Sequence, residues 1–247
     1  MNTWTILFSA VLFLGSVNSL PATRQFSASC SLSDARLQVP TNQTQLIPPK
    51  FSPSFIALGV GTQNYTCNAT SSTYVSVLFH CRWPGPNLYT SLTGAVAELF
   101  DSSCLYGTPE FDTAPELVYT AWEASAGLVT PQDVIGSFGL VPNPFVLGQH
   151  MYVPSPTGSG LSPKWDFTSS GGTAGNPNAY VIGAKVGDLP SSDPTVNIDN
   201  LMIKAIQGDL ASQIFRVQNN GGQAPAACGT QGSGSNITVK YTAQYCT

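Results

Sequence analysis

The chain has 247 residues, of which only 9% are charged, and its net charge is −4. Such a chain lacks the lysine and arginine needed to neutralise phosphates, so we expect no nucleic-acid partner. Glycine and proline are abundant, which favours turns and short strands over a helical bundle.

The N-terminus has the pattern of a secretory signal peptide. Trp4 to Gly15 is an apolar run, and Val17 and Ser19 place small or modest side chains just before a cleavage point after Ser19. The run is too short to cross a bilayer, which takes roughly 20 residues. We therefore expect residues 1–19 to be removed, and the mature chain to be secreted without a membrane attachment.

The mature chain, residues 20–247, is expected to form a single extracellular domain that begins with an extended arm. Residues 20–53 are polar and interrupted by prolines, which favour an extended segment. Beyond the arm, β-branched and aromatic runs bounded by turn residues predict strands. The expected strands are Phe55–Cys67, Tyr74–Phe79, Gly94–Asp101, Phe145–Val153, Tyr180–Val186, Ile198–Gln207, Ile214–Gln218 and Ile237–Tyr245.

One helix is expected among these strands. Thr113 to Glu116 (TAPE) matches a capping box and an apolar face follows it, so we predict a helix over residues 114–124. Residues 154–175 hold several glycines and prolines and are expected to be a long loop. Many short strands with one short helix predict an all-β fold, either a sandwich or a barrel.

The covalent chemistry agrees with export. Six cysteines lie beyond the signal peptide, and an even number in an exported chain indicates disulfide bonds, although 15 pairings are possible. No CxxC spacing is present, and with two histidines a histidine-rich site cannot be built, so no metal site is expected. Asn64 and Asn68 lie close together, so we expect only one of the two to carry a glycan. The four motifs that predict glycosylation are at Asn42, Asn64, Asn68 and Asn236.

Phe55 to Cys67 contains the one stretch that resembles a nucleotide-binding loop. Gly59-Val-Gly61-Thr-Gln-Asn64 matches the start of GxGxxG, with asparagine in the place of the third glycine. Such a loop must lead into a helix that receives the pyrophosphate, whereas the residues after Asn64 are β-like. We therefore interpret the two glycines as a bulge or a close approach of strands, and we expect no cofactor.

Five stretches, in order along most of the mature chain, carry a resemblance to a known family. They are IALGVGTQNYTC (Ile56–Cys67), GAVAELFD (Gly94–Asp101), NLMIKAIQG (Asn200–Gly208), RVQNNGGQAPAAC (Arg216–Cys228) and VKYTAQY (Val239–Tyr245). They resemble a family of exported fungal and bacterial proteins of unknown function, some fungal members of which are labelled malate dehydrogenase. The resemblance implies an exported β-rich domain and no particular mechanism. NAD-dependent malate dehydrogenase activity is not expected, because the loop at Gly59 lacks its helix.

The resemblance also leads to a disulfide scheme. Cys67 and Cys228 end the two most specific stretches, so we expect a bond between them. The pairs that would complete the set are Cys30–Cys104 and Cys81–Cys246. Cys81 and Cys246 depart from the family pattern and form an additional pair.

Few residues offer catalytic chemistry. His150, in an expected strand before the loop 154–175, is the weak candidate for catalysis, and His80 is the only other histidine. Lys204 and Arg216 lie in apolar stretches. Because a buried charge needs a partner, we expect an ion pair with one of the acidic residues.

Two classes of function remain. The favoured one is a non-catalytic extracellular or cell-surface protein, with a binding or structural role, that takes a glycan or a small apolar ligand. The ligand would lie on the loop 154–175 and on exposed aromatic rings, for which Trp83, Trp122 and Trp165 are candidates. The alternative is an extracellular hydrolase that uses His150 with nearby acids.

Overall fold

The computed structural model describes residues 30–76, 94–125, 129–139, 146–229 and 234–247. Within these ranges β-strands dominate. The strands are β1 (Ile56–Asn68), β2 (Thr73–Ser76), β3 (Gly94–Asp101), β4 (Val146–Pro154), β5 (Leu161–Asp166), β6 (Tyr180–Leu189), β7 (Asn200–Gln207), β8 (Gln213–Gly221) and β9 (Asn236–Cys246). The α-helices are α1 (Glu110–Ala124) and α2 (Pro131–Phe138), with short 3-10 turns η1 (Ser103–Leu105) and η2 (Gly171–Thr173).

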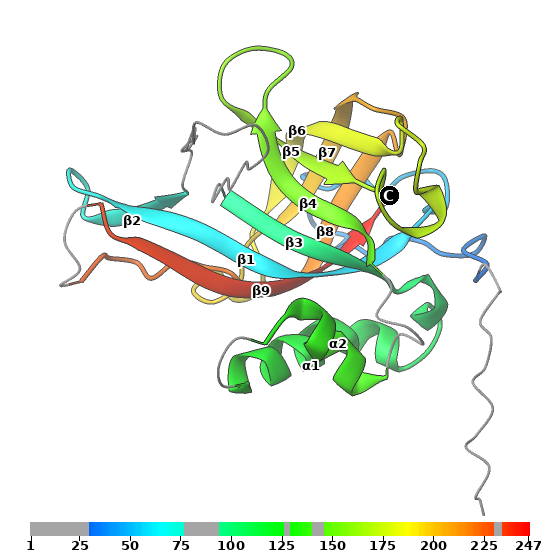
Figure 1. Cartoon of the computed structure of the whole chain (residues 1–247), viewed down its shortest axis with the longest axis horizontal. Helices are drawn as coiled ribbons and strands as arrows, with labels where there is room; N and C mark the ends of the chain where they lie inside the picture. Colours follow the sequence, from blue (N-terminus) through cyan, green and yellow to red (C-terminus); the bar gives the residue numbers. More distant parts are fainter. Residues whose placement is uncertain (1–29, 77–93, 126–128, 140–145, 230–233) are drawn as a thin grey trace, which may run out of the picture.

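Eight of the strands form a closed antiparallel barrel (Figure 1). From β3 to β9 each strand pairs with the next along the chain, and β1 pairs with both β3 and β9, which closes the sheet. The far end of β1 extends past the barrel and pairs with β2. Closure removes the exposed sheet edges that an open sandwich would have. Of the two all-β architectures that the sequence allows, the barrel is therefore the one adopted.

The barrel interior is filled by alternate side chains of its strands, as the two-residue period of a strand requires. Trp165, Tyr241 and Tyr245 are its largest members, packed with aliphatic residues from β3, β7 and β8. Gly59 lies directly beneath Tyr245, because a Cβ atom there would come 2.5 Å from the tyrosine ring. The structural interpretation of Gly59 is confirmed: it admits a bulky ring to the core, and the β1 ladders show no bulge beside it.

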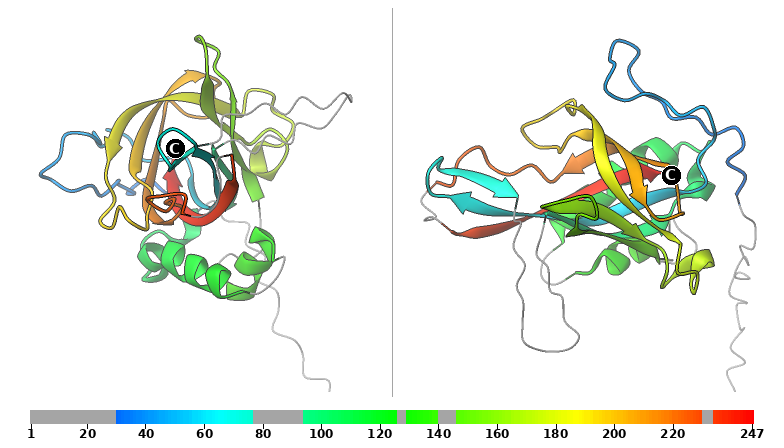
Figure 2. Two further views of the ribbon diagram at one scale, coloured as in Figure 1. Left: turned by 90° about the vertical axis from the view of Figure 1, so that its left-hand side faces the viewer. Right: turned by 90° about the horizontal axis from the view of Figure 1, so that it is seen from above.

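The outer face of β1, β3 and β9 is covered by the two helices (Figures 1 and 2). Leu58 and Phe100 pack against Val118, Trp122 and Ile135 there. Polar side chains of β9 bond to α1 carbonyls, as when the Thr242 hydroxyl donates to the Pro115 oxygen at 2.6 Å. The two helices therefore form a second layer that packs on this part of the barrel wall.

The sequence prediction of one helix over residues 114–124 is incomplete. The helix begins at Glu110, and Thr113 is no cap, since its hydroxyl donates to the Glu110 carbonyl within the first turn. The real capping box belongs to the unpredicted α2, where Thr130 accepts from the Asp133 backbone and Asp133 accepts from the Thr130 backbone. That pattern, with Pro131 in the first turn, was readable in the sequence.

The expected loop 154–175 also contains a strand. β5 lies within it and places Trp165 in the core. Pro163 is tolerated because the ladder to β6 begins only at Lys164, so the missing N–H costs nothing on that side. The remaining predicted strands are confirmed over the described residues, with small differences at their ends.

Two of the three expected disulfide bonds are present. Cys67 is bonded to Cys228 and Cys30 to Cys104. The expected bond to Cys246 is not formed: Cys246 is a free thiol that packs in an apolar cluster at the end of β9. Burial raises the pKa of this thiol to about 12. Cys81, its expected partner, lies outside the described residues, as do His80, Trp83 and the expected signal peptide.

None of the helices in the described ranges combines the length and the apolar character that a membrane crossing needs.

Candidate functional site

His150 lies inside the barrel rather than on its surface. Its ring stacks on Trp165 with 4.5 Å between the ring centroids, and its Nδ1 lies 3.0 Å from the Lys164 carbonyl oxygen. Because a carbonyl only accepts, Nδ1 carries the proton and donates it. Burial lowers the pKa of His150 to about 4, so the ring is neutral near pH 7. No carboxylate contacts the ring among the described residues, and the surroundings are those of a packed core.

Among the described residues, Arg216 is the one charged side chain brought deep into the same interior, and it is 7% exposed. Its Nη2 donates to the Asp199 carbonyl oxygen at 2.8 Å, and its side chain also bonds to Tyr245. The expected ion pair with an acid is not formed in the described part of the chain, because neutral oxygens solvate the guanidinium. Lys204, by contrast, is exposed on the outer face of β7.

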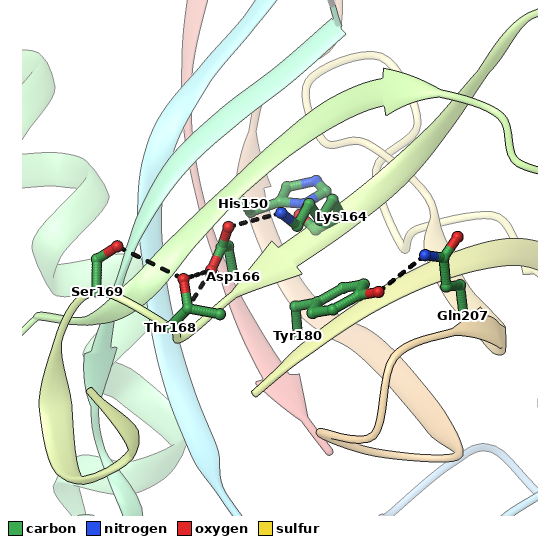
Figure 3. A network of polar contacts seen from close by, with 7 residues as sticks. All are labelled: His150, Lys164, Asp166, Thr168, Ser169, Tyr180 and Gln207. Carbon is green, nitrogen blue, oxygen red and sulfur yellow. Dashed lines mark hydrogen bonds and ion pairs between the residues drawn. The ribbon is translucent and has the colours of Figure 1, made fainter. Parts of the chain in front are cut away.

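A polar network runs over the outer face of β5 and β6, on the opposite side of the wall from the His150 ring (Figure 3). Lys164 pairs with Asp166 at 2.7 Å, and Asp166 also accepts from the Thr168 hydroxyl at 2.6 Å. The Lys164 ammonium lies 4.9 Å from the Tyr180 ring centroid, and Gln207 donates to the Tyr180 hydroxyl. Each group is satisfied by a neighbour, so the network fastens three strands together and leaves no activated nucleophile.

The arm forms a loop that starts and ends at one place on the barrel. The Ser52 hydroxyl donates to the Ser33 carbonyl oxygen at 2.6 Å, and Arg36 Nη1 donates to the same hydroxyl at 2.6 Å. We call residues 33–52 the arm loop. Figure 2 shows it projecting from the barrel beside β7 and β8. The Cys30–Cys104 bond holds its base to η1.

The tip of the arm loop returns to the barrel wall. Leu46 is buried in a cluster with Met202, Phe215 and Val217 on the outer face of β7 and β8. The side chain of Gln43 accepts from the Leu46 N–H and donates to the Leu46 carbonyl, which fixes the turn at the tip.

A groove of about 1090 Å³ lies between the arm loop, the start of α1 and the outer face of β8. This volume is slightly above the usual range for small-molecule sites, which are mostly apolar and contain few polar groups. Its polar lining residues are chiefly amides and hydroxyls, among them Asn200, Gln213 and Gln218, with Arg36, Lys50 and Asp112 as the charged members. The apolar side chains on its two walls are Leu37, Val39, Leu46, Ile47 and Phe51 from the arm loop, and Phe111, Leu189, Phe215 and Val217 from the body.

The groove is not where the sequence placed a ligand. None of residues 154–175 lines it. Trp122 and Trp165 are both buried, so neither offers a surface ring for a sugar. The sequence signal that points to the groove is the apolar content of the arm. Leu46, Ile47 and Phe51 stand in an otherwise polar, proline-rich segment that is too short to form a hydrophobic core by itself.

The expected glycosylation sites differ in accessibility. The side chains of Asn42, Asn68 and Asn236 are exposed. Asn64 is 4% exposed, and its Nδ2 donates to the Gly94 carbonyl oxygen at 3.1 Å. The nitrogen to which a glycan would be attached is therefore enclosed at Asn64 alone.

A family model described as a protein of unknown function (DUF3455) matches residues 48–247. The chain belongs to the DUF3455 family. The matched region includes every strand of the barrel and both helices. In this DUF3455 protein most of the arm loop, through residue 47, precedes the matched region, whereas Phe51 on the same wall of the groove lies within it. No curated protein and no solved structure matches the chain.

Proposed function

We propose that this DUF3455 protein is a non-catalytic extracellular binding protein that takes a small apolar ligand into the groove between the arm loop and β8. The observation that carries the proposal is the pair of apolar walls around a 1090 Å³ groove. On the arm wall, Ile47 is 64% exposed and Phe51 is 83% exposed. Large apolar side chains that gather on an exposed concave surface mark a binding site, whereas apolar side chains exposed singly are common on any protein.

The two apolar walls favour a largely apolar ligand. Burial of apolar ligand surface contributes roughly 25 cal/mol per Å², so a molecule of about 200 Å² gains several kcal/mol before its entropy losses. The amides of Gln213 and Gln218 can orient one polar group on such a ligand. A glycan is the less favoured occupant, because stacking of sugars needs exposed aromatic faces and the tryptophans at 122 and 165 are buried.

An extracellular setting is part of the proposal. Residues 1–19 have the pattern of a cleaved signal peptide, and two disulfide bonds of long sequence separation suit an oxidising compartment. We infer that glycans occupy exposed sites on the surface. The wide groove then receives its ligand from the extracellular fluid.

The proposal is tested by titration with N-phenyl-1-naphthylamine, an uncharged apolar probe whose fluorescence rises when it leaves water. The wild-type protein is expected to bind it saturably at one site. Gln213→Trp places an indole over the groove floor and is expected to weaken binding about tenfold or more. The control, Lys204→Trp, lies directly across the β7–β8 ladder but does not line the groove, and it should bind as the wild type does.

Two outcomes would overturn the proposal. One is the absence of saturable binding to the folded wild-type protein. The other is equal binding by Gln213→Trp and the wild type, which would place the probe elsewhere on the molecule.

A further inference from the structure

The arm loop is attached strongly at its base and weakly at its tip. At the base, the Cys30–Cys104 bond is covalent, and Leu32 and Ala35 are buried with Ile56 in a small cluster. Arg36 and Ser52 close the loop on itself there. The base therefore stays in place whenever the barrel is folded.

The tip is held by packing and not by a ladder of hydrogen bonds. Within the described ranges no backbone hydrogen bond joins residues 36–53 to the barrel. Within residues 36–53, Leu46 is the only side chain that is fully buried, in its cluster with Phe215 and Met202. Segments with few buried apolar contacts and no backbone ladder open at low free energy, ahead of global unfolding.

Gly187 on β6 sets how closely the tip approaches the barrel. A Cβ atom at this position would come 2.1 Å from the Gln45 carbonyl oxygen and 3.0 Å from the Met202 Cβ. The backbone of Gly187 does not have a positive φ, so alanine can adopt it. An alanine there would consequently push the Gln45 backbone and the tip outward, with a smaller displacement at Met202.

We propose that the arm loop is the movable wall of the groove, which opens by withdrawing Leu46 from its cluster while the Cys30–Cys104 bond keeps the base fixed. This inference rests on the proposed function for its purpose, because the opening admits the apolar ligand and the closing retains it. The geometry of the two attachments carries the motion itself. Leu46 and Gly187 are then the residues that set the balance between the closed and open positions.

Cys246 offers a direct readout of this motion. Its thiol is free, lines the groove and packs against the cluster that contains Leu46. With the tip closed the Cys246 side chain is half-buried. When the tip opens, the thiol loses the covering of Leu46, and a reagent such as iodoacetamide reacts with it faster. Alkylation of the Cys246 peptide, followed by mass spectrometry under native conditions, measures the open fraction without any ligand.

Four variants of the full mature chain make the test specific. Leu46→Ala removes the side chain that anchors the tip, and Gly187→Ala displaces the tip. Each is expected to raise the Cys246 alkylation rate about tenfold, because the loss of one core contact shifts the equilibrium from the closed to the open position by about that factor. The matched controls are Leu117→Ala on the exposed face of α1 and Gly172→Ala, where an added Cβ meets nothing within 4 Å. Both controls should keep the wild-type rate. Trypsin cleavage after the exposed Lys50 should rise in the same two variants.

Low concentrations of urea separate local opening from global unfolding. The proposal expects the alkylation rate of the wild type to depend weakly on urea, because opening the tip exposes little surface. An alkylation rate that follows global unfolding would overturn the proposal. So would an alkylation rate and a cleavage rate that are each the same in the wild type and in all four variants. Added N-phenyl-1-naphthylamine should slow alkylation of the wild type. If the probe does not bind, the proposed function fails, while the comparison of Leu46→Ala with Leu117→Ala still decides whether the arm moves.

Discussion

At the scale of single residues, His150 couples folding to pH. Its pKa falls from 6.5 to about 4 through burial, so between these values the unfolded chain binds a proton that the folded chain does not. The contribution to stability is therefore complete above pH 6.5 and is lost as the pH falls towards 4, by about 3 kcal/mol at most. We predict a decline in the free energy of unfolding between pH 7 and pH 5, measured by urea titration.

Replacement of the imidazole isolates this effect. His150→Gln should be less stable than the wild type at pH 7, because it disturbs the stack on Trp165, but its stability should change little between pH 7 and pH 5. A His150→Gln variant that retains the full decline would assign the pH dependence to other groups.

The second prediction at this scale concerns glycan occupancy. Because the Asn64 amide is enclosed and bonded to Gly94, we expect glycans at Asn42, Asn68 and Asn236 and none at Asn64. Enzymatic release of N-glycans in heavy-oxygen water marks each occupied asparagine as aspartate, which peptide mass spectrometry detects. Label at Asn64 in the folded, secreted protein would contradict the placement of this side chain.

Single residues also show where sequence reasoning reaches its limit. The structural interpretation of Gly59 needed only the absence of a following helix, but the ring that it accommodates comes from Tyr245 at the opposite end of the chain. For Arg216, burial was foreseen and its partner was not. The Asp199 backbone oxygen carries no signature in a sequence, whereas a carboxylate partner would.

At the scale of elements, the two helices provide a matched test of helix capping. Thr130 caps α2 through two reciprocal bonds with Asp133, whereas Thr113 only bonds within the first turn of α1. Thr130→Ala is expected to lower the free energy of unfolding by about 1 kcal/mol. Thr113→Ala should change it by a few tenths of a kcal/mol at most, in the same urea titration. Equal losses would indicate that the sequence-derived cap at Thr113 is real.

The elements differ in how well the sequence predicts them for a physical reason. β1 and β3 show continuous apolar, β-prone runs with turn residues at their ends, so their limits are predicted within one residue. β5 was missed because glycines and prolines surround it, and only its pairing with β4 and β6 makes it a strand. Tertiary pairing of this kind overrides local composition.

At the scale of the whole molecule, the sequence predicts an all-β fold but not the closure of the sheet. Whether β9 returns to pair with β1 depends on the twist and tilt of all eight strands, which no single segment encodes. The Cys67–Cys228 bond was expected from the resemblance and is consistent with that closure, since it joins β1 to the segment before β9. The groove is less predictable still, because its walls come from the arm, the start of α1 and β8.

The position of a bound apolar molecule tests the central claim most directly. Crystals of the protein soaked with 1-bromonaphthalene can be measured at the bromine absorption edge, and the anomalous difference map locates the bromine without reference to any assumed site. We predict a peak between the arm loop and the outer face of β8, within contact distance of Phe215. A peak inside the barrel beside His150, or no peak from a protein that binds the compound saturably in solution, would contradict the account.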